Sequence, residues 1–189
     1  RDIATALRAS QPSGDIRLLT TPNASLTLGY YGDFQTIGTV YWENLAGLRG
    51  AAELFSARSA DEAAALVRER KVTHIAMLSE EDFLAPYYQL LYPQATEEGF
   101  ASSFGHQLLV ERRVPPWLQV IPYRVPEDLA STGVEVFLYK VAFDQSPAEA
   151  LYNRALGEVA RGELPQAVRD FDSLIVRDPA SGALTFEVA

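Results

Sequence analysis

The chain of 189 residues contains no cysteine. This absence excludes disulfides, thiolate nucleophiles and cysteine-based metal sites, and it leaves the cellular compartment open. Histidine is also scarce, because only His74 and His106 are present and they are far apart in the sequence. A transition-metal site is therefore not expected.

The sequence also has no long hydrophobic run and few basic residues. No stretch approaches the roughly 20 apolar residues that a membrane-spanning helix requires. Lys and Arg total 16 against 25 for Asp and Glu, which gives a net charge of −9. Such a charge repels phosphate backbones and anionic lipid surfaces, so we expect no nucleic-acid partner. The chain begins at Arg1 without a signal peptide, and we expect it to be an excised part of a longer protein.

The common catalytic motifs are missing as well. There is no GxSxG and no GxxxxGK[ST] sequence, and the residues after the first predicted strand, TTPNASLTLG, lack the glycine-rich turn of dinucleotide-binding proteins. The acid pairs at 80–81 and 97–98 fall in the first turns of predicted helices, where they favour the helix dipole. The sequence therefore predicts no catalytic residues and no cofactor.

The residues that are present indicate an α/β fold. Hydrophobic residues make up 48% of the chain, as in ordinary globular proteins. Short apolar runs at 16–20, 34–41 and 73–78 predict strands, and the segments between them carry helical patterns. We therefore expect a three-layer domain with a mostly parallel sheet and helices on both faces. The run Val134–Phe143 predicts a last strand, antiparallel at the sheet edge, after a proline-rich extended segment over 114–133.

Polar residues mark where the helices begin and end. Asn44 fits the N-cap of a helix in which Leu45, Leu48, Ala52 and Phe55 form a stripe that faces the core. Thr21 precedes Pro22 in the arrangement of another helix start, and Ser59 and Glu62 have the spacing of a capping box. Gly32 is expected to end the helix that starts at Pro22.

The C-terminal part of the chain has a different pattern. Residues 148–181 resemble one tetratricopeptide repeat, with small, turn, small, aromatic and terminal-proline residues in register at Ala155, Gly162, Ala167, Phe171 and Pro179. We therefore predict an α/β domain over 1–145 and a helical hairpin over 146–189. Since one repeat is not stable alone, the hairpin either packs on the α/β domain or is followed by further repeats.

The candidate functional residues lie at the end of the second predicted strand. Tyr41, Trp42, Glu43 and Asn44 stand between this strand and the next helix, where parallel sheets commonly bind ligands and where aromatic and polar side chains suit a sugar. The alternative is a structural role, with Asn44 as the cap and the two rings packed against the sheet.

A second group of residues stands at the end of the preceding helix. Tyr31 and Asp33, together with Tyr30, extend the same set if the helix end lies near the strand end. The alternative here is that the tyrosines are core residues with solvated hydroxyl groups.

The segment over 16–141 resembles the extracytoplasmic α/β domain of bacterial polytopic membrane proteins, namely type-C glycosyltransferases and the catalytic subunits of oligosaccharyltransferases. The parts that carry the resemblance are Leu18–Leu19, Tyr30–Tyr31, Tyr41–Asn44, Leu54–Phe55, Asp61–Arg70, Val72–Leu78, the PPWL sequence at 115–118 and the strand VEVFLYKV. The Trp-Trp-Asp-Tyr-Gly motif of oligosaccharyltransferases is absent, because Trp42 and Trp117 are the only tryptophans.

The resemblance implies a non-catalytic domain on the periplasmic side of a membrane protein, joined to the membrane through a segment before Arg1. Its partners would be a glycan or lipid-linked sugar acceptor. The absent tryptophan motif favours a lipid-linked sugar transferase or a non-catalytic relative over protein N-glycosylation. Two alternatives remain open: a protein-interaction module in which the hairpin binds the partner, and a free-standing soluble enzyme.

Overall fold

The computed structural model describes residues 1–39, 41, 43–80 and 82–177. The strands are β1 (Arg17–Leu19), β2 (Gln35–Ile37), β3 (His74–Leu78), β4 (Leu118–Ile121) and β5 (Val136–Val141). The helices are α1 (Asp2–Ser10), α2 (Pro22–Gly32), α3 (Leu45–Phe55), α4 (Ala60–Glu69), α5 (Leu84–Leu91), α6 (Glu97–Ala101), α7 (Phe104–Leu109), α8 (Glu127–Ala130), α9 (Pro147–Arg161) and α10 (Leu164–Arg177).

The strands form one mixed sheet in the order β2-β1-β3-β5-β4. β1 pairs in parallel with β2 and β3, as the alternation of strands and helices predicts. β5 is antiparallel to both of its neighbours, so its direction is as expected but its place is not. The edge position next to β5 belongs to β4, which lies within the proline-rich segment that is expected to be extended and is not predicted as a strand. Its register joins Val120 to Tyr139 of β5.

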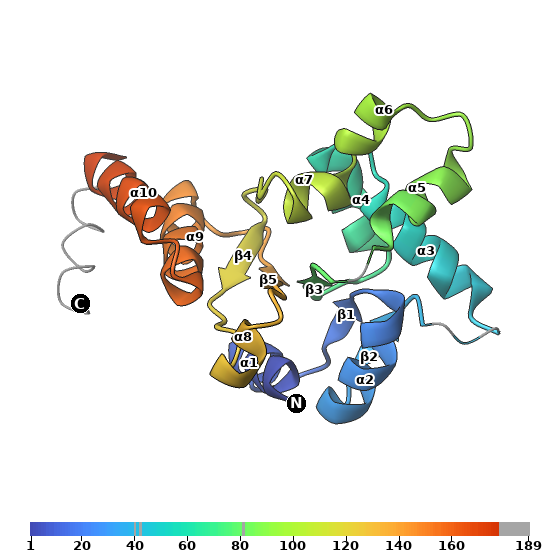
Figure 1. Cartoon of the computed structure of the whole chain (residues 1–189), viewed down its shortest axis with the longest axis horizontal. Helices are drawn as coiled ribbons and strands as arrows, with labels where there is room; N and C mark the ends of the chain where they lie inside the picture. The colour runs from blue at the N-terminus through green and yellow to red at the C-terminus, as the bar shows by residue number, and fades with distance from the viewer. Residues whose placement is uncertain (40, 42, 81, 178–189) are drawn as a thin grey trace.

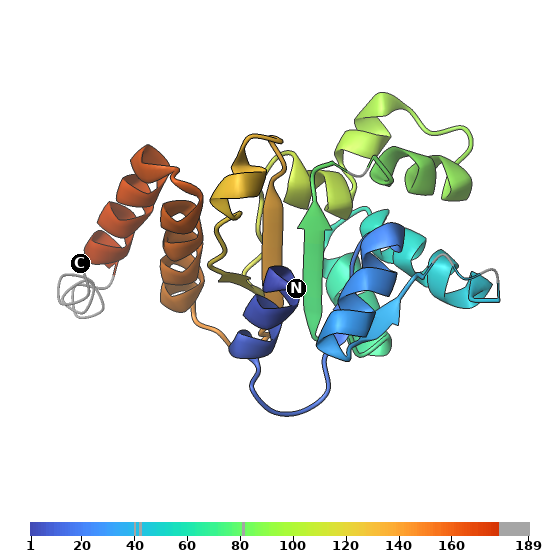
Figure 2. The same ribbon diagram turned by 60° about the horizontal axis from the view of Figure 1, so that its bottom comes forward.

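Helices cover both faces of the sheet, as predicted (Figures 1 and 2). On one face, α3, α4, α5 and α7 bury a core that includes Leu19, Ile75 and Phe137. On the other face, α1 and α2 pack over Leu18 and Leu138. Because neighbouring residues of one strand enter opposite cores, the central strands are apolar without a break.

The second strand is shorter than the apolar run over 34–41 indicates. β2 ends at Ile37 because Gly38 has a φ of +79°, a left-handed conformation that glycine adopts without steric cost. A Cβ atom at Gly38 would also lie 2.6 Å from the Cβ of Ala51, so α3 approaches the backbone there closely. The chain therefore leaves the sheet before Tyr41.

The predicted helix starts are present. The Thr21 hydroxyl accepts a hydrogen bond from the Ala24 amide, and the Ser59 hydroxyl accepts one from the Glu62 amide at 3.1 Å. The end of α2 differs from the prediction, because Asp33 rather than Gly32 takes the left-handed position, with a φ of 51°. Aspartate tolerates this conformation better than most residues do.

His74 is a buried structural residue at the start of β3. Its Nε2 atom lies 3.1 Å from the Ser10 hydroxyl, and its Nδ1 atom lies 2.9 Å from the Thr73 hydroxyl. Burial, together with the charges of Lys140 and Arg8, lowers the pKa of His74 to about 4. The ring is therefore neutral at physiological pH and joins β3 to α1.

The chain after Ser146 forms two antiparallel helices, α9 and α10. Ser146 and Glu149 make a full capping box at the start of α9, and Gly162, with a φ of 80°, ends it. Ala155 and Ala167 are buried, and the ring of Phe171 packs against Tyr152 at 6.2 Å. Pro179 lies outside the described residues, and the likeness to a tetratricopeptide repeat stays a prediction, as does the division into two domains.

The α9–α10 hairpin packs on the body of the molecule. α9 lies against β4 and covers the sheet edge, on the left of Figure 1. Covering an edge strand prevents it from pairing with another chain. Of the two arrangements that one repeat allows, the structure therefore has the hairpin packed on the α/β body. Within the described residues, no helix is both long and apolar enough to cross a membrane.

Candidate functional site

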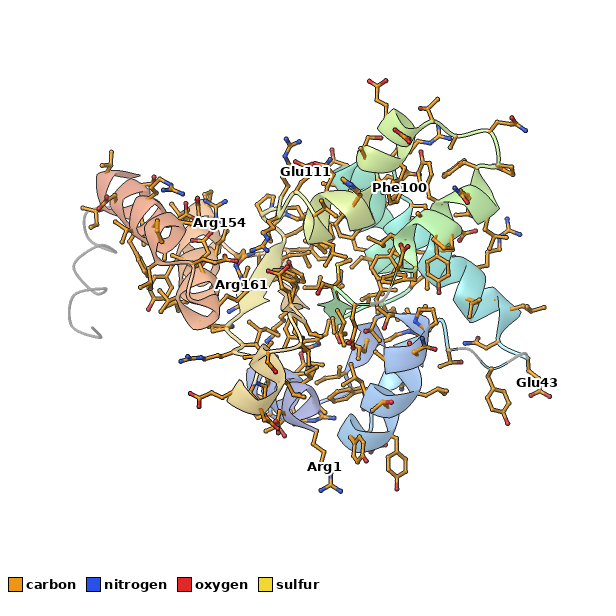
Figure 3. The ribbon with its side chains drawn as sticks, viewed as in Figure 1. Arg1, Glu43, Phe100, Glu111, Arg154 and Arg161 are labelled. Carbon is orange, nitrogen blue, oxygen red and sulfur yellow. The ribbon has the colours of Figure 1, made fainter. Side chains whose placement is uncertain are left out.

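The turn after β2 exposes the side chains that the sequence singles out. Tyr41 is 61% exposed, and Glu43 is also exposed. Figure 3 shows Glu43 at the end of α3 that points away from the sheet. Trp42 lies outside the described residues. The prediction that Leu45 faces the core is wrong, because Leu45 is 74% exposed and adds an apolar side chain to this turn.

Asn44 has the mechanical role that its position predicts. Its Oδ1 atom accepts a hydrogen bond from the Gly47 amide at 3.2 Å, which caps α3. Its Nδ2 atom donates to the Thr39 hydroxyl at 2.9 Å and so ties the turn together. Asn44 is therefore occupied, and among the described residues of this turn the polar side chains that remain open to a ligand are Tyr41 and Glu43.

Tyr31 and Asp33 lie at the other end of β2. They precede the strand, whereas the Tyr41 turn follows it, so the two groups do not meet in one cleft. Tyr31 packs edge-on against Tyr30 at 5.3 Å and lies 5.1 Å from the guanidinium carbon of Arg1. It also lines a groove of about 460 Å³ between α1 and α2.

A feature that the sequence did not indicate is a cavity of about 370 Å³ between the hairpin and the sheet. Its walls come from the segment after α7, from β4 and β5, and from α9 and α10. The lining residues are Glu111, Arg112, Val114, Val120, Phe137, Tyr139, Arg154, Glu158, Arg161, Glu163 and Gln166. Figure 3 labels Arg154 and Arg161, which lie between the hairpin and β4. The residues that line the cavity are spread over positions 111 to 166, and no local sequence motif connects them.

Ion pairs hold the arginines of this cavity. Arg112 binds Glu135 at 2.5 Å and also contacts Glu163. Arg161 donates to Glu163 at 2.9 Å. Arg154 pairs with the buried Asp170, whose other oxygen accepts from Gln166 at 3.3 Å.

Glu158 is the exception among the charged groups. Its side chain lies in the cavity wall, the residue is only 5% exposed, and its buried Oε2 atom has no hydrogen-bond partner among the described residues. Burial is the main cause that raises the pKa of Glu158 to about 7, and the charge of Asp170 adds to it. Arg154 and Arg161 oppose this rise. A metal site is not indicated, because the described part of the chain contains no group of three or more potential ligands.

The fold is a mixed five-stranded α/β sheet with helices on both sides, which defines the structural class. It is similar to the crystal structure of the C-terminal globular domain of an oligosaccharyltransferase from Archaeoglobus fulgidus, with a TM-score of 0.55 and 17% identity, over 74% of this chain and 94% of that one. A second such domain from the same organism gives a TM-score of 0.48 and 16% identity, over 74% and 93%. No protein-family model matches the sequence, and no curated protein does.

Proposed function

We propose that this chain is the non-catalytic extracytoplasmic domain of a membrane glycosyltransferase-like protein. The observation that carries the proposal is its similarity to 94% of the globular domain of an oligosaccharyltransferase, at a TM-score of 0.55. The sequence parts that resemble type-C glycosyltransferases point to the same class. In this function the domain lies on the periplasmic side of the membrane, where it covers the membrane active site or holds a lipid-linked sugar acceptor.

The coding sequence upstream of Arg1 tests this placement in the membrane. We expect it to encode several apolar segments of about 20 residues, each long enough to cross a bilayer. A start codon close to Arg1 would contradict the proposal and would leave a free-standing soluble protein.

The functional edge in this proposal is the turn that contains Tyr41, Trp42, Glu43 and Asn44. Tyr41 and Leu45 are exposed at a place where packing does not require them to be apolar. Exposed aromatic side chains at the end of a strand suit the apolar face of a sugar, and a nearby carboxylate such as Glu43 accepts hydrogen bonds from its hydroxyl groups.

Replacing Tyr41 with alanine is therefore expected to reduce function without reducing stability. In the full-length membrane protein, transfer of labelled sugar from membrane lipid should fall about tenfold, as for an interface aromatic residue. The melting temperature should stay within about 2 °C of the parent value, since exposed substitutions rarely matter. Tyr30→Ala is the matched control, because Tyr30 is 84% exposed at the other end of β2. A large loss of stability with unchanged transfer would support the packing role instead.

The second candidate function is a protein-interaction module centred on the hairpin. One observation favours it: Leu164 and Val168, one turn apart on α10, are each 57% exposed. Adjacent exposed aliphatic residues on a helix face are typical of a surface that another helix covers.

A photo-crosslinker placed at residue 168 of the full-length protein in its native membrane tests this surface. We expect one discrete protein adduct, and we expect Leu164→Glu to remove it while the melting temperature stays unchanged. A crosslinker at Glu97, which is exposed on α6, is the control. If both positions give the same adducts, the hairpin has no specific partner.

A further inference from the structure

The cavity between the hairpin and the sheet is built from charged groups that are nearly all paired. Arg112 and Arg161 both bind Glu163, and Arg154 binds Asp170. Among the described residues that line this cavity, two buried side-chain atoms have no hydrogen-bond partner, namely Oε2 of Glu158 and Nε of Arg161. One atom is an acceptor and the other is a donor.

An unpaired buried carboxylate oxygen is unusual. Leaving such an atom without a hydrogen bond destabilises the folded state, and buried polar groups in native proteins are nearly always satisfied. Glu158 lies on α9 where that helix packs against the sheet, so replacement by an apolar residue would relieve the cost. A buried polar group that has no hydrogen bond within the protein and lies in a cavity wall is expected to contact a ligand.

The charges of the cavity limit what the ligand can be. The paired carboxylates of Glu163 and Asp170 and the unpaired carboxylate of Glu158 disfavour an anion. The guanidinium groups of Arg112, Arg154 and Arg161 disfavour a cation for the same reason. A neutral molecule that both donates and accepts hydrogen bonds matches the two unpaired atoms.

The apolar walls and the volume of the cavity limit the ligand further. Val114, Val120 and Phe137 supply aliphatic and aromatic surface next to the polar groups. The volume of about 370 Å³ lies at the lower end of the range of small-molecule sites, which is roughly 300–1,000 Å³. That volume suits a ligand with one ring rather than a long chain.

We propose that this cavity binds a neutral, hydroxyl-rich ligand with the size of one sugar ring, whose hydroxyl groups donate to Glu158 and accept from Arg161. Apolar C–H groups of the ring pack against Val120 and Phe137. The site is separate from the Tyr41 turn, and it does not depend on the function proposed above. It also places the ligand between α9 and β4, so that binding strengthens the contact of the hairpin with the sheet.

Amide shifts in two-dimensional NMR of the chain 1–189 test the proposal at about pH 8, where Glu158 is ionised. The probes are methyl α-glucoside, methyl α-mannoside and N-acetylglucosamine, each titrated to about 50 mM. We expect at least one to shift amides of β4, β5 and α9 saturably, with a dissociation constant of about 1–10 mM for roughly a dozen heavy atoms. Glu158→Gln should weaken binding at least about fivefold, because it replaces a charge-assisted hydrogen bond by a neutral one.

The design separates a binding effect from a folding effect. Glu158→Gln removes a buried charge and is expected to be more stable than the parent, so lost binding cannot come from unfolding. Glu69→Gln, at an exposed position on α4, is the matched control and should bind like the parent. The proposal is overturned if no sugar shifts the cavity amides, or if Glu158→Gln binds as well as the parent. It is equally overturned if only phosphate or putrescine shifts those amides.

Discussion

Gly157→Val is expected to release the α9–α10 hairpin from the sheet edge. Gly157 is buried in the middle of α9, and a Cβ atom there would lie 2.4 Å from Cγ1 of Val120. Val120 is buried in β4, and its branched side chain has few rotamers that would move it away. We expect the free energy of unfolding to fall by about 2–3 kcal/mol, within the range of overpacked cores.

The measurement is guanidinium unfolding of the chain 1–189, combined with hydrogen exchange of the α9 amides. Exchange should accelerate in α9 and β4 and stay unchanged in β1, because α9 packs against β4, which β5 and β3 separate from β1. In an exposed helix, replacing glycine with alanine gains about 1 kcal/mol. At Gly157, however, alanine should destabilise, since close approach outweighs helix propensity.

Two further variants make this prediction specific. Val159→Ile adds one carbon to an exposed position of the same helix and should leave stability unchanged. Val120→Ala makes room for the new methyl group, so it should partly rescue Gly157→Ala in a double-mutant cycle. Additive effects of the two substitutions would show that Val120 and residue 157 are not in contact.

Glu158→Gln is expected to stabilise the protein above neutral pH. The folded state raises the pKa of Glu158 from about 4.5 to about 7, so it binds this proton more tightly than the unfolded chain does. The contribution of Glu158 to stability is therefore greatest below about pH 4.5 and declines as the pH rises to about 7. The pKa difference of roughly 2.5 units corresponds to about 3 kcal/mol.

Thermal unfolding of the parent and of Glu158→Gln between about pH 4 and pH 8 measures this effect. Each unit of pKa difference between the folded and unfolded states changes the free energy of unfolding by about 1.4 kcal/mol. The groups that face Glu158 are Arg154 and Arg161 on its own helix, Asp170 on α10 and Glu163 between the helices. Because other groups also titrate, the difference between parent and variant isolates Glu158. His74, for example, has the opposite pH dependence. Its pKa is lowered in the folded state, so its contribution to the stability of the protein is lost as the pH falls from about 6.5 to about 4.

The expected difference grows with pH and levels off above about pH 7. Glu69→Gln is the control and should track the parent at every pH. A constant difference between parent and Glu158→Gln would contradict the prediction, because it would mean that Glu158 titrates normally in the folded protein.

The helix starts show how much of the fold was readable from the sequence. Thr21, Asn44 and Ser59 each cap a helix because their partners are amides only three residues away. The sheet edge shows the opposite case. The run Leu118–Ile121 lies in a proline-rich segment and is not predicted as a strand. It becomes β4 because it pairs with β5, which begins 15 residues after β4 ends. Because β4 lies at the edge, β5 lies between β3 and β4, whereas the sequence predicts β5 at the edge.

The candidate sites divide in the same way. The Tyr41 turn was visible because it follows an apolar run and precedes a cap. Whether it binds a ligand stays a prediction, and the structure separates Tyr31 and Asp33 from it, because they lie before β2 and the turn lies after it. The cavity around Glu158 was not visible, since its residues come from positions 111 to 166 and meet only when α9 packs on β4.

Composition, caps and apolar periodicity thus determined by themselves that this chain is an α/β protein with a terminal pair of helices and without cysteine. These properties depend on contacts within about one helical turn or one strand. Only the tertiary structure decided which strand lies at the edge, that Gly157 permits the hairpin to approach it, and that Oε2 of Glu158 has no hydrogen-bond partner among the described residues. Those outcomes depend on packing between distant segments, where a single atom at Val120 or a single missing hydrogen bond decides the result.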